Sequence, residues 1–292
     1  MMEPEHQFIQ TNGIKLHCAI QGSGPTLLCL HGFPEFWYGW KNQIPFFSKK
    51  FRVVAPDMRG YNLSDKPEGV AAYRIGVLVE DIHGIIKTLG EEKVFLAAHD
   101  WGGMVAWHFA GRYPRQVRKL VILNAPHPTI FARELRHNPE QQMASQYTLL
   151  LRSSRAEEIL SRNDFEWLRK AVFEGCKDPS AFDSRDRAAY LEAWSRPGAL
   201  TGGVNYYRAA GMLEALDGAK AAEGVDTEEE GRVRVPTLVI WGEKDTALTI
   251  RLLGGLESYV SDLKIIRIPH ATHWVQHDAP EEVNQSMMEF LD

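Results

Sequence analysis

The sequence has 292 residues, of which 44% are hydrophobic and 24% are charged, and its formal net charge is -5 at pH 7. These values are typical of a globular protein that is large enough to bury a substantial core. Basic residues are scattered rather than grouped, which argues against nucleic acid or an anionic membrane as a partner, and no apolar run is long enough to span a bilayer.

Apolar runs of strand length alternate with helical stretches in the first part of the chain. The strand-like runs lie at 26–32, 52–57, 93–99 and 119–126, and an amphipathic stretch of helical spacing lies at 72–90. Continuous runs of Val, Ile and Leu predict strands that are buried on both faces. The alternation of strands and helices therefore predicts an α/β fold with a mostly parallel central sheet flanked by helices.

This alternation is interrupted in the middle of the chain. From about residue 129 to 210 no comparable strand occurs, and aromatic-rich helical segments replace the strands. Strand-like runs return at 236–245 and 263–270, and Pro280 stands where a last helix would begin. The helical block is therefore predicted to be an insertion into the α/β domain.

We accordingly divide the chain into three predicted segments. Residues 1–128 form the first part of the core, residues 129–216 form a helical cap, or lid, and residues 217–292 begin with a linker and continue as the second part of the core. The stretch at 217–233 is acidic, rich in Gly and short of large apolar groups, which is typical of a surface linker.

The stretch LAAHDWGGMVAW at 96–107 places Asp100 between a strand and a helix. So tight a turn needs residues that tolerate crowding or positive φ, such as the pair Gly102 and Gly103. Taken alone, Asp100 is equally well explained as a helix N-cap and as a catalytic group. Asp245 and His273 also follow predicted strands, however, and open parallel sheets bind their ligands at the carboxyl ends of the strands.

The order of these three groups is that of an α/β-hydrolase, with an aspartate where the nucleophile elbow usually carries serine. Five motifs strengthen this resemblance: HGFPEFWYGW (31–40), DMRGYNLSD (57–65), HDWGG (99–103), WGEKD (241–245) and THW (272–274). Together they resemble the epoxide hydrolase branch of the α/β-hydrolase fold family, from about residue 25 to 290. The resemblance implies an enzyme that opens an epoxide to a vicinal diol without a cofactor.

The resemblance also implies a role for each motif residue. Asp100 is the expected nucleophile, which attacks a saturated carbon and forms an alkyl-enzyme ester. His273 then activates water against that ester, and Asp245 orients the imidazole. The backbone N–H groups of Phe33 and Trp101 form the expected oxyanion hole. The expected substrate pocket is lined by Trp101, Phe33 and Pro34, and the expected substrate is a small apolar epoxide that reacts with water.

Two cap tyrosines complete the implied site, because a phenol can protonate the oxygen of the opening ring. NYYRAAG (205–211) resembles the second-tyrosine motif of the family and points to Tyr207. The first tyrosine is matched less closely by Tyr147 in SQYTLLLR, with Tyr190 as a competitor. The sequence departs from the family at Thr272, where glycine usually precedes the histidine, and at Asn62, where a second glycine is usual.

Three other functions fit the sequence less well than an epoxide hydrolase. A haloalkane dehalogenase would share Asp100 and His273 but would not need paired tyrosines, and a fluoroacetate dehalogenase would be expected to carry arginines beside the nucleophile. A non-catalytic ligand-binding protein would not need the intact set of three groups.

Metal and cofactor sites are not indicated. His270 and His273 form H-x-x-H, which is one residue shorter than the metalloprotease spacing, and we interpret His277 as a surface residue. The GSGP stretch at 22–25 precedes a strand rather than a helix and so does not match a phosphate-binding loop. We therefore predict neither a metal nor a cofactor, and the oligomeric state is left open.

Cysteine usage bears on the compartment. Cys18, Cys29 and Cys176 are far apart, and two of them lie in apolar, strand-like contexts. This pattern suits neither a disulfide framework nor a zinc site. We therefore predict buried thiols in a reducing compartment, the cytoplasm.

Overall fold

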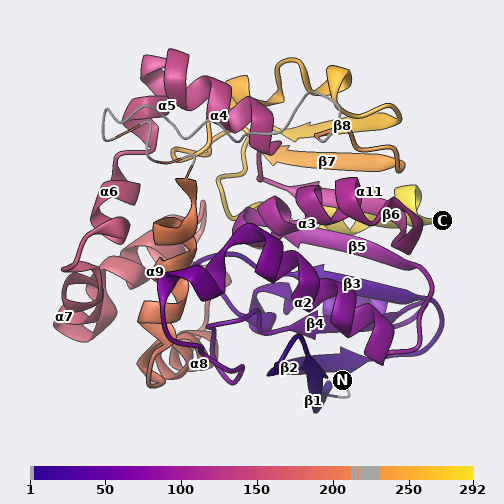
Figure 1. Ribbon diagram of the computed structural model, residues 1–292, viewed down its shortest axis with the longest axis horizontal. Coiled ribbons are helices and arrows are strands. Elements are labelled where there is room, and N and C mark those ends of the chain that lie inside the picture. Colours follow the sequence, from indigo (N-terminus) through magenta and orange to yellow (C-terminus); the bar gives the residue numbers. More distant parts are fainter. Residues whose placement is uncertain (1–2, 212, 214–215, 217–230) are drawn as a thin grey trace.

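The computed structural model describes residues 3–211, 213, 216 and 231–292 (Figure 1). Most of the acidic linker predicted at 217–233 lies outside these residues. Within the described residues, no helix is both long enough and apolar enough to cross a membrane. Cys18, Cys29 and Cys176 are buried and free.

In the part of the chain that the structure describes, one sheet of eight strands forms the centre of the molecule, in the order β1-β2-β4-β3-β5-β6-β7-β8. The strands are β1 (Glu5–Thr11), β2 (Ile14–Gln21), β3 (Thr26–Leu30), β4 (Arg52–Pro56), β5 (Val94–His99), β6 (Val117–Leu123), β7 (Thr237–Gly242) and β8 (Leu263–Ile268). From β4 to β8 all neighbours run parallel, whereas β2 pairs antiparallel with β1 and with β4. The predicted α/β fold with a mostly parallel sheet is confirmed.

The two antiparallel strands on one side of the sheet, β1 and β2, are not predicted from the sequence. In β1 only Ile9 and Thr11 are buried, so the strand has no apolar run to detect. In β2 the buried residues include His17, whose polar ring interrupts the apolar pattern. The edge strand β1, which has one solvated face, lacks the continuous hydrophobicity on which the other predictions rest.

Helices cover both faces of the sheet. They are α1 (Ile44–Phe47), α2 (Ile75–Thr88), α3 (Asp100–Arg112), α4 (Pro128–His137), α5 (Pro139–Ala144), α6 (Tyr147–Arg152), α7 (Ala156–Arg169), α8 (Ser184–Ser195), α9 (Ala199–Ala209), α10 (Val275–Asp278) and α11 (Pro280–Leu291). Alternate residues of one strand serve the two faces: Leu28 and Leu30 join the core under α2 and α3, whereas Leu27 and Cys29 join the core under α1 and α11. The strands are therefore buried on both sides.

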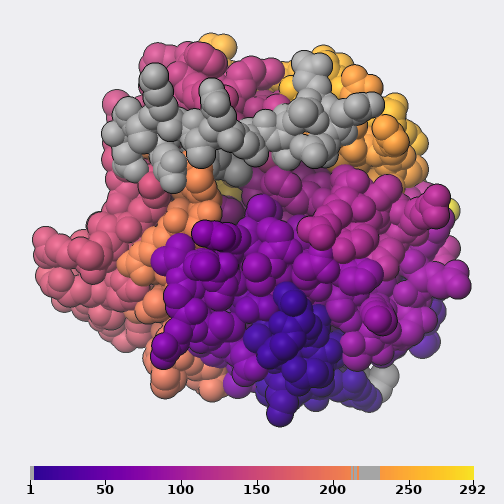
Figure 2. All heavy atoms as spheres, viewed as in Figure 1, coloured from indigo at the N-terminus to yellow at the C-terminus, as the bar shows by residue number. Residues whose placement is uncertain are grey.

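Helices α4 to α9 follow β6 and precede β7, and the sheet receives no strand from the described residues between them. Figure 1 shows α6 to α9 beside the ends toward which the strand arrows point. In Figure 2 the region of α7 projects as a lobe at one side of the molecule. This position at the carboxyl ends of the strands suits the cap that we predict for residues 129–216.

Candidate active site

Asp100 stands at a crowded reversal between β5 and α3. Its φ is +49°, in the left-handed region, where a residue other than glycine is strained by about 1–3 kcal/mol. A Cβ on Gly32 would lie 2.2 Å from Asp100 Oδ1, and a Cβ on Gly102 would lie 2.4 Å from the carbonyl oxygen of Leu30. The glycines of HGFPE and HDWGG therefore let the reversal push one carboxylate out above the sheet.

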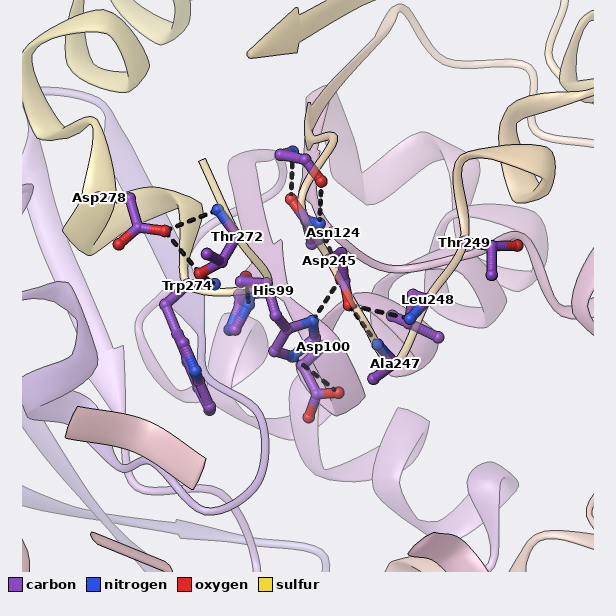
Figure 3. A network of polar contacts seen from close by, with 12 residues as sticks. His99, Asp100, Asn124, Asp245, Ala247, Leu248, Thr249, Thr272, Trp274 and Asp278 are labelled. Atoms are coloured by element: carbon purple, nitrogen blue, oxygen red, sulfur yellow. Dashed lines mark hydrogen bonds and ion pairs between the residues drawn. The ribbon is translucent and has the colours of Figure 1, made fainter. Parts of the chain in front are cut away.

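His273 lies between this carboxylate and that of Asp245, and Figure 3 shows Asp100 and Asp245 in the same network of polar contacts. His273 Nδ1 is 2.7 Å from Asp245 Oδ2, and His273 Nε2 is 3.5 Å from Asp100 Oδ2. Asn124 also donates to Asp245 Oδ2 at 2.8 Å. The other oxygen of Asp245 accepts two backbone N–H groups, those of Ala247 and Leu248. The imidazole is thus held between two carboxylates, one of which is itself fixed by several donors.

The buried His273 and Asp100 shift each other's pKa toward the charged form. Burial alone would lower the pKa of His273, but the charges of Asp245 and Asp100 and a hydrogen bond to each of them outweigh burial and raise this pKa to about 10. Burial alone would raise the pKa of Asp100, and the nearby His273 lowers it instead. At neutral pH the site therefore holds an ionised carboxylate facing a protonated imidazole.

Backbone donors lie next to Asp100. The Phe33 N–H donates to Asp100 Oδ1 at 2.7 Å. Trp101 directly follows Asp100 in the first turn of α3, where a backbone N–H has no partner within its own helix. One oxygen of the carboxylate is therefore bound by a backbone donor, and the other oxygen faces His273.

A cavity of about 640 Å³ opens onto these groups. Its lining consists of Phe33, Pro34, Asp100, Tyr147, Trp167, Lys170, Ala171, Glu174, Gly175, Tyr207, Lys244, Thr246, Ala247, Thr272, His273 and Trp274. The cavity thus brings together the predicted nucleophile, histidine and two tyrosines. The side chain of Trp101, which we predict to line the pocket, is not in this lining; its ring packs against Tyr207, with centroids 5.0 Å apart.

The two tyrosines reach the cavity from different helices. Tyr147 begins α6 and Tyr207 lies in α9, and their ring centroids are 6.3 Å apart. Burial raises the pKa of both phenols, and the charge of Asp100 adds to the effect. Both therefore stay protonated and can donate. Tyr190, the competitor of Tyr147, instead donates to Glu35 at 2.6 Å and does not line the cavity.

Glu35, the last residue of HGFPE, forms a buried cluster that the sequence analysis did not predict. Only 1% of Glu35 is exposed, and its carboxylate accepts from Tyr190, from Gln276 at 3.0 Å and from His277 at 2.7 Å. Burial alone would raise the pKa of Glu35, but His277 and His99 hold it well below its usual range. The cluster ties the loop that carries Phe33 to α8 and α10.

The interpretation of His277 as a surface residue is wrong. It is 3% exposed, and Glu35 binds its ring. The error has a physical reason, since the partner lies 242 positions away in the chain and no local pattern reveals it. His99 lies beside the same Glu35 cluster, and its ring hydrogen-bonds the backbone carbonyl of His273 at 2.9 Å.

The departure at Asn62 leaves its turn intact, because Asn62 adopts a φ of +40° and its side chain donates to Asp57 at 2.8 Å. Asparagine takes this left-handed conformation more readily than most residues.

No group of three or more His, Cys, Asp or Glu side chains among the described residues is arranged to hold a metal ion.

Comparisons with known proteins agree with this geometry. A family model described as the alpha/beta hydrolase fold matches residues 25–280. "AB hydrolase superfamily protein YfhM" of Bacillus subtilis is 42% identical to this chain, over 98% of this chain and 97% of the relative. "Epoxide hydrolase 2" of Caenorhabditis elegans is 35% identical, over 98% of this chain and 80% of the relative.

Solved structures are similar as well. The crystal structure of a mutant of an epoxide hydrolase from Bacillus megaterium superposes with a TM-score of 0.89 and is 40% identical, over 98% of this chain and 99% of that one. A second structure of that enzyme, complexed with its product (R)-3-[1]naphthyloxy-propane-1,2-diol, has a TM-score of 0.89, 39% identity and the same coverage.

Proposed function

Because this chain belongs to the epoxide hydrolase branch of the α/β-hydrolase fold family, we propose that it hydrolyses an epoxide to a vicinal diol through a covalent ester on Asp100. One observation carries the proposal. Asp100, His273 and two tyrosines, Tyr147 and Tyr207, line the same cavity. Such a cavity can supply a nucleophile, a base and an acid to one small molecule.

In the first step the carboxylate attacks a ring carbon. The Phe33 N–H occupies Asp100 Oδ1, which leaves Oδ2 to form the new C–O bond. A carboxylate makes this attack without first losing a proton. The ring C–O bond breaks, and Tyr147 or Tyr207 gives its hydroxyl proton to the oxygen that leaves the carbon. The product of this step is a neutral alkyl-enzyme ester.

In the second step water hydrolyses the ester. Alkylation removes the charge of Asp100, which is one of the two carboxylate charges that raise the pKa of His273. The pKa of the imidazole then falls, and the imidazolium gives its proton through solvent to the tyrosinate that the first step left behind. The neutral ring can then take a proton from water. The resulting hydroxide attacks the ester carbon. The oxyanion forms on Oδ1, where the Phe33 N–H already lies. The intermediate collapses as the bond between the ester carbon and Oδ2 breaks, and the imidazolium of His273 gives its proton to the departing alkoxide, which leaves as the diol.

A single turnover in heavy-oxygen water tests this pathway. With enzyme in excess over styrene oxide, we expect the heavy oxygen in the peptide that carries Asp100, and ordinary oxygen in the first diol released. Mass spectrometry of both fractions measures the distribution. Heavy oxygen that enters the first diol directly would contradict the covalent step. A haloalkane of similar size serves as the control substrate, and we expect no halide release.

Loss of a cavity hydroxyl should slow the first step. We expect Tyr207→Phe and Tyr147→Phe each to lower the rate of ester formation by about tenfold or more, because a general acid contributes about 10²–10⁴-fold and a second phenol remains. Rapid quenching followed by intact-protein mass spectrometry measures the ester. Tyr206→Phe is the matched control: Tyr206 lies on the same helix, but its hydroxyl donates to the Arg59 carbonyl and lines no part of the cavity.

Similar rates of ester formation for Tyr207→Phe, Tyr206→Phe and the wild type would remove Tyr207 from the acid role.

The substrate class follows from the cavity, which has room for a small, largely apolar molecule. The naphthyloxy diol bound by the Bacillus megaterium enzyme supports the inclusion of aryl glycidyl ethers among the test substrates.

A further inference from the structure

The loop that carries His273 is attached to one wall of the cavity at two points. The wall consists of residues 170–177, whose first turn is a π-helix from Lys170 to Glu174. The indole N–H of Trp274 donates to the carbonyl of Ala171 at 2.8 Å. The backbone N–H of Lys177 donates to Asp278 Oδ1 at 2.7 Å. This segment, which we call the cap wall, is therefore bonded to the residue that precedes α10 and to the last residue of α10.

The other oxygen of Asp278 binds the residue immediately before the histidine (Figure 3). Asp278 Oδ2 accepts from the backbone N–H of Thr272 at 2.7 Å and from its hydroxyl at 2.6 Å. One carboxylate thus receives three hydrogen bonds, two from the histidine loop and one from the cap wall. Hydrogen bonds to an ionised acceptor are stronger than those between neutral groups.

Thr272 has little freedom on its other side. A Cβ on Gly242, the last residue of β7, would lie 2.1 Å from the carbonyl oxygen of Thr272. The next carbonyl, that of His273, accepts from His99 at 2.9 Å. The backbone that carries the imidazole is therefore packed against β7 and bound by Asp278 and His99.

Thr272 stands where the resemblance to the family implies glycine. Glycine has a backbone N–H but no hydroxyl, so it could make only one of the two bonds from residue 272 to Asp278. The side-chain bond is a property of this chain's own residues. Glycine at this position would be more flexible, whereas the Asp278 carboxylate holds Thr272 by two atoms, its backbone nitrogen and its hydroxyl oxygen.

We propose that Thr272 and Asp278 are positioning residues, which fix the imidazole of His273 for hydrolysis of the ester and couple that step to the position of the cap wall. The inference rests on the proposed function, because it assigns these residues to its second step. Neither residue hydrogen-bonds Asp100, Tyr147 or Tyr207, which carry the first step. The two steps should therefore respond differently to substitution.

The test measures the two steps separately. We expect Thr272→Val and Asp278→Asn to slow ester hydrolysis by about tenfold, because small displacements of a catalytic group are costly in rate, and to leave ester formation within about twofold of the wild type. Thr272→Ser keeps the hydroxyl and should restore hydrolysis. Enzyme is mixed with styrene oxide and quenched in acid, and intact-protein mass spectrometry follows the rise and decay of the ester.

A matched control is Asp178→Asn. Asp178 also accepts a backbone N–H, that of Ser180 at 2.9 Å, and it adjoins the cap wall without touching the histidine loop. Both rates should stay unchanged in this variant. The amplitude of ester formation gives the active fraction, so a variant that folds poorly loses amplitude and the rate constants still report on the remaining enzyme.

Equal slowing of both steps in Thr272→Val, or wild-type hydrolysis in both Thr272→Val and Asp278→Asn, would overturn the inference. Failure of Thr272→Ser to restore hydrolysis would overturn the role of the hydroxyl. A wild-type enzyme that forms diol without any ester would overturn the proposed function itself, and that result is distinct from the others because it appears before any variant is made.

Discussion

Replacement of Asp100 by Asn is expected to lower diol formation at least about 10⁴-fold, the scale on which loss of a covalent nucleophile acts. A carboxamide is a poor nucleophile toward a saturated carbon, and it carries no charge to neutralise the imidazolium that faces Asp100 Oδ2 at 3.5 Å. No ester should form. Product chromatography measures the diol, and intact-protein mass spectrometry measures the ester under the same conditions.

The fold should survive this substitution. Asparagine adopts the left-handed backbone of residue 100 as readily as aspartate does, and its side-chain oxygen can still accept the Phe33 N–H. A thermal unfolding midpoint close to that of the wild type checks this point. Asp100→Ala is the companion variant, because it cannot revert to aspartate by deamidation. Diol formation by Asp100→Ala at a rate near the wild type would exclude Asp100 as the nucleophile.

Replacement of His273 by Gln is expected to trap the ester. The first step needs Asp100 and the tyrosines, so one equivalent of substrate should add to the enzyme. The second step loses the group that takes a proton from water, and we expect hydrolysis to slow by about 10³–10⁴-fold. The mass of the intact protein should therefore increase by one substrate and persist for many wild-type turnover times.

His270→Gln is the matched control for this experiment. His270 belongs to the same loop and forms the other half of the H-x-x-H pattern, but it pairs with Glu282 at 3.1 Å and does not line the cavity. It should form and release the ester at wild-type rates. If His273→Gln released diol as fast as His270→Gln and accumulated no adduct, His273 could not be the base of the second step.

The sequence was sufficient for those features that depend on local pattern. Continuous apolar runs identified the six strands from β3 to β8, and the residues after β5, β7 and β8 include Asp100, Asp245 and His273. Parallel strands end at the same edge of a sheet, so the order of these residues along the chain was enough to predict that they meet. The structure places His273 Nδ1 2.7 Å from Asp245 and its Nε2 3.5 Å from Asp100.

The tertiary structure alone decided how each tyrosine and each buried charge is used. The sequence favours Tyr147 by a loose motif match and leaves Tyr190 as a competitor, whereas packing turns Tyr147 into the cavity and binds Tyr190 to Glu35. The same packing buries His277 and directs the ring of Trp101 against Tyr207. The surroundings of a side chain are set by segments far away in the chain, and the spacing of residues within one segment carries no information about them.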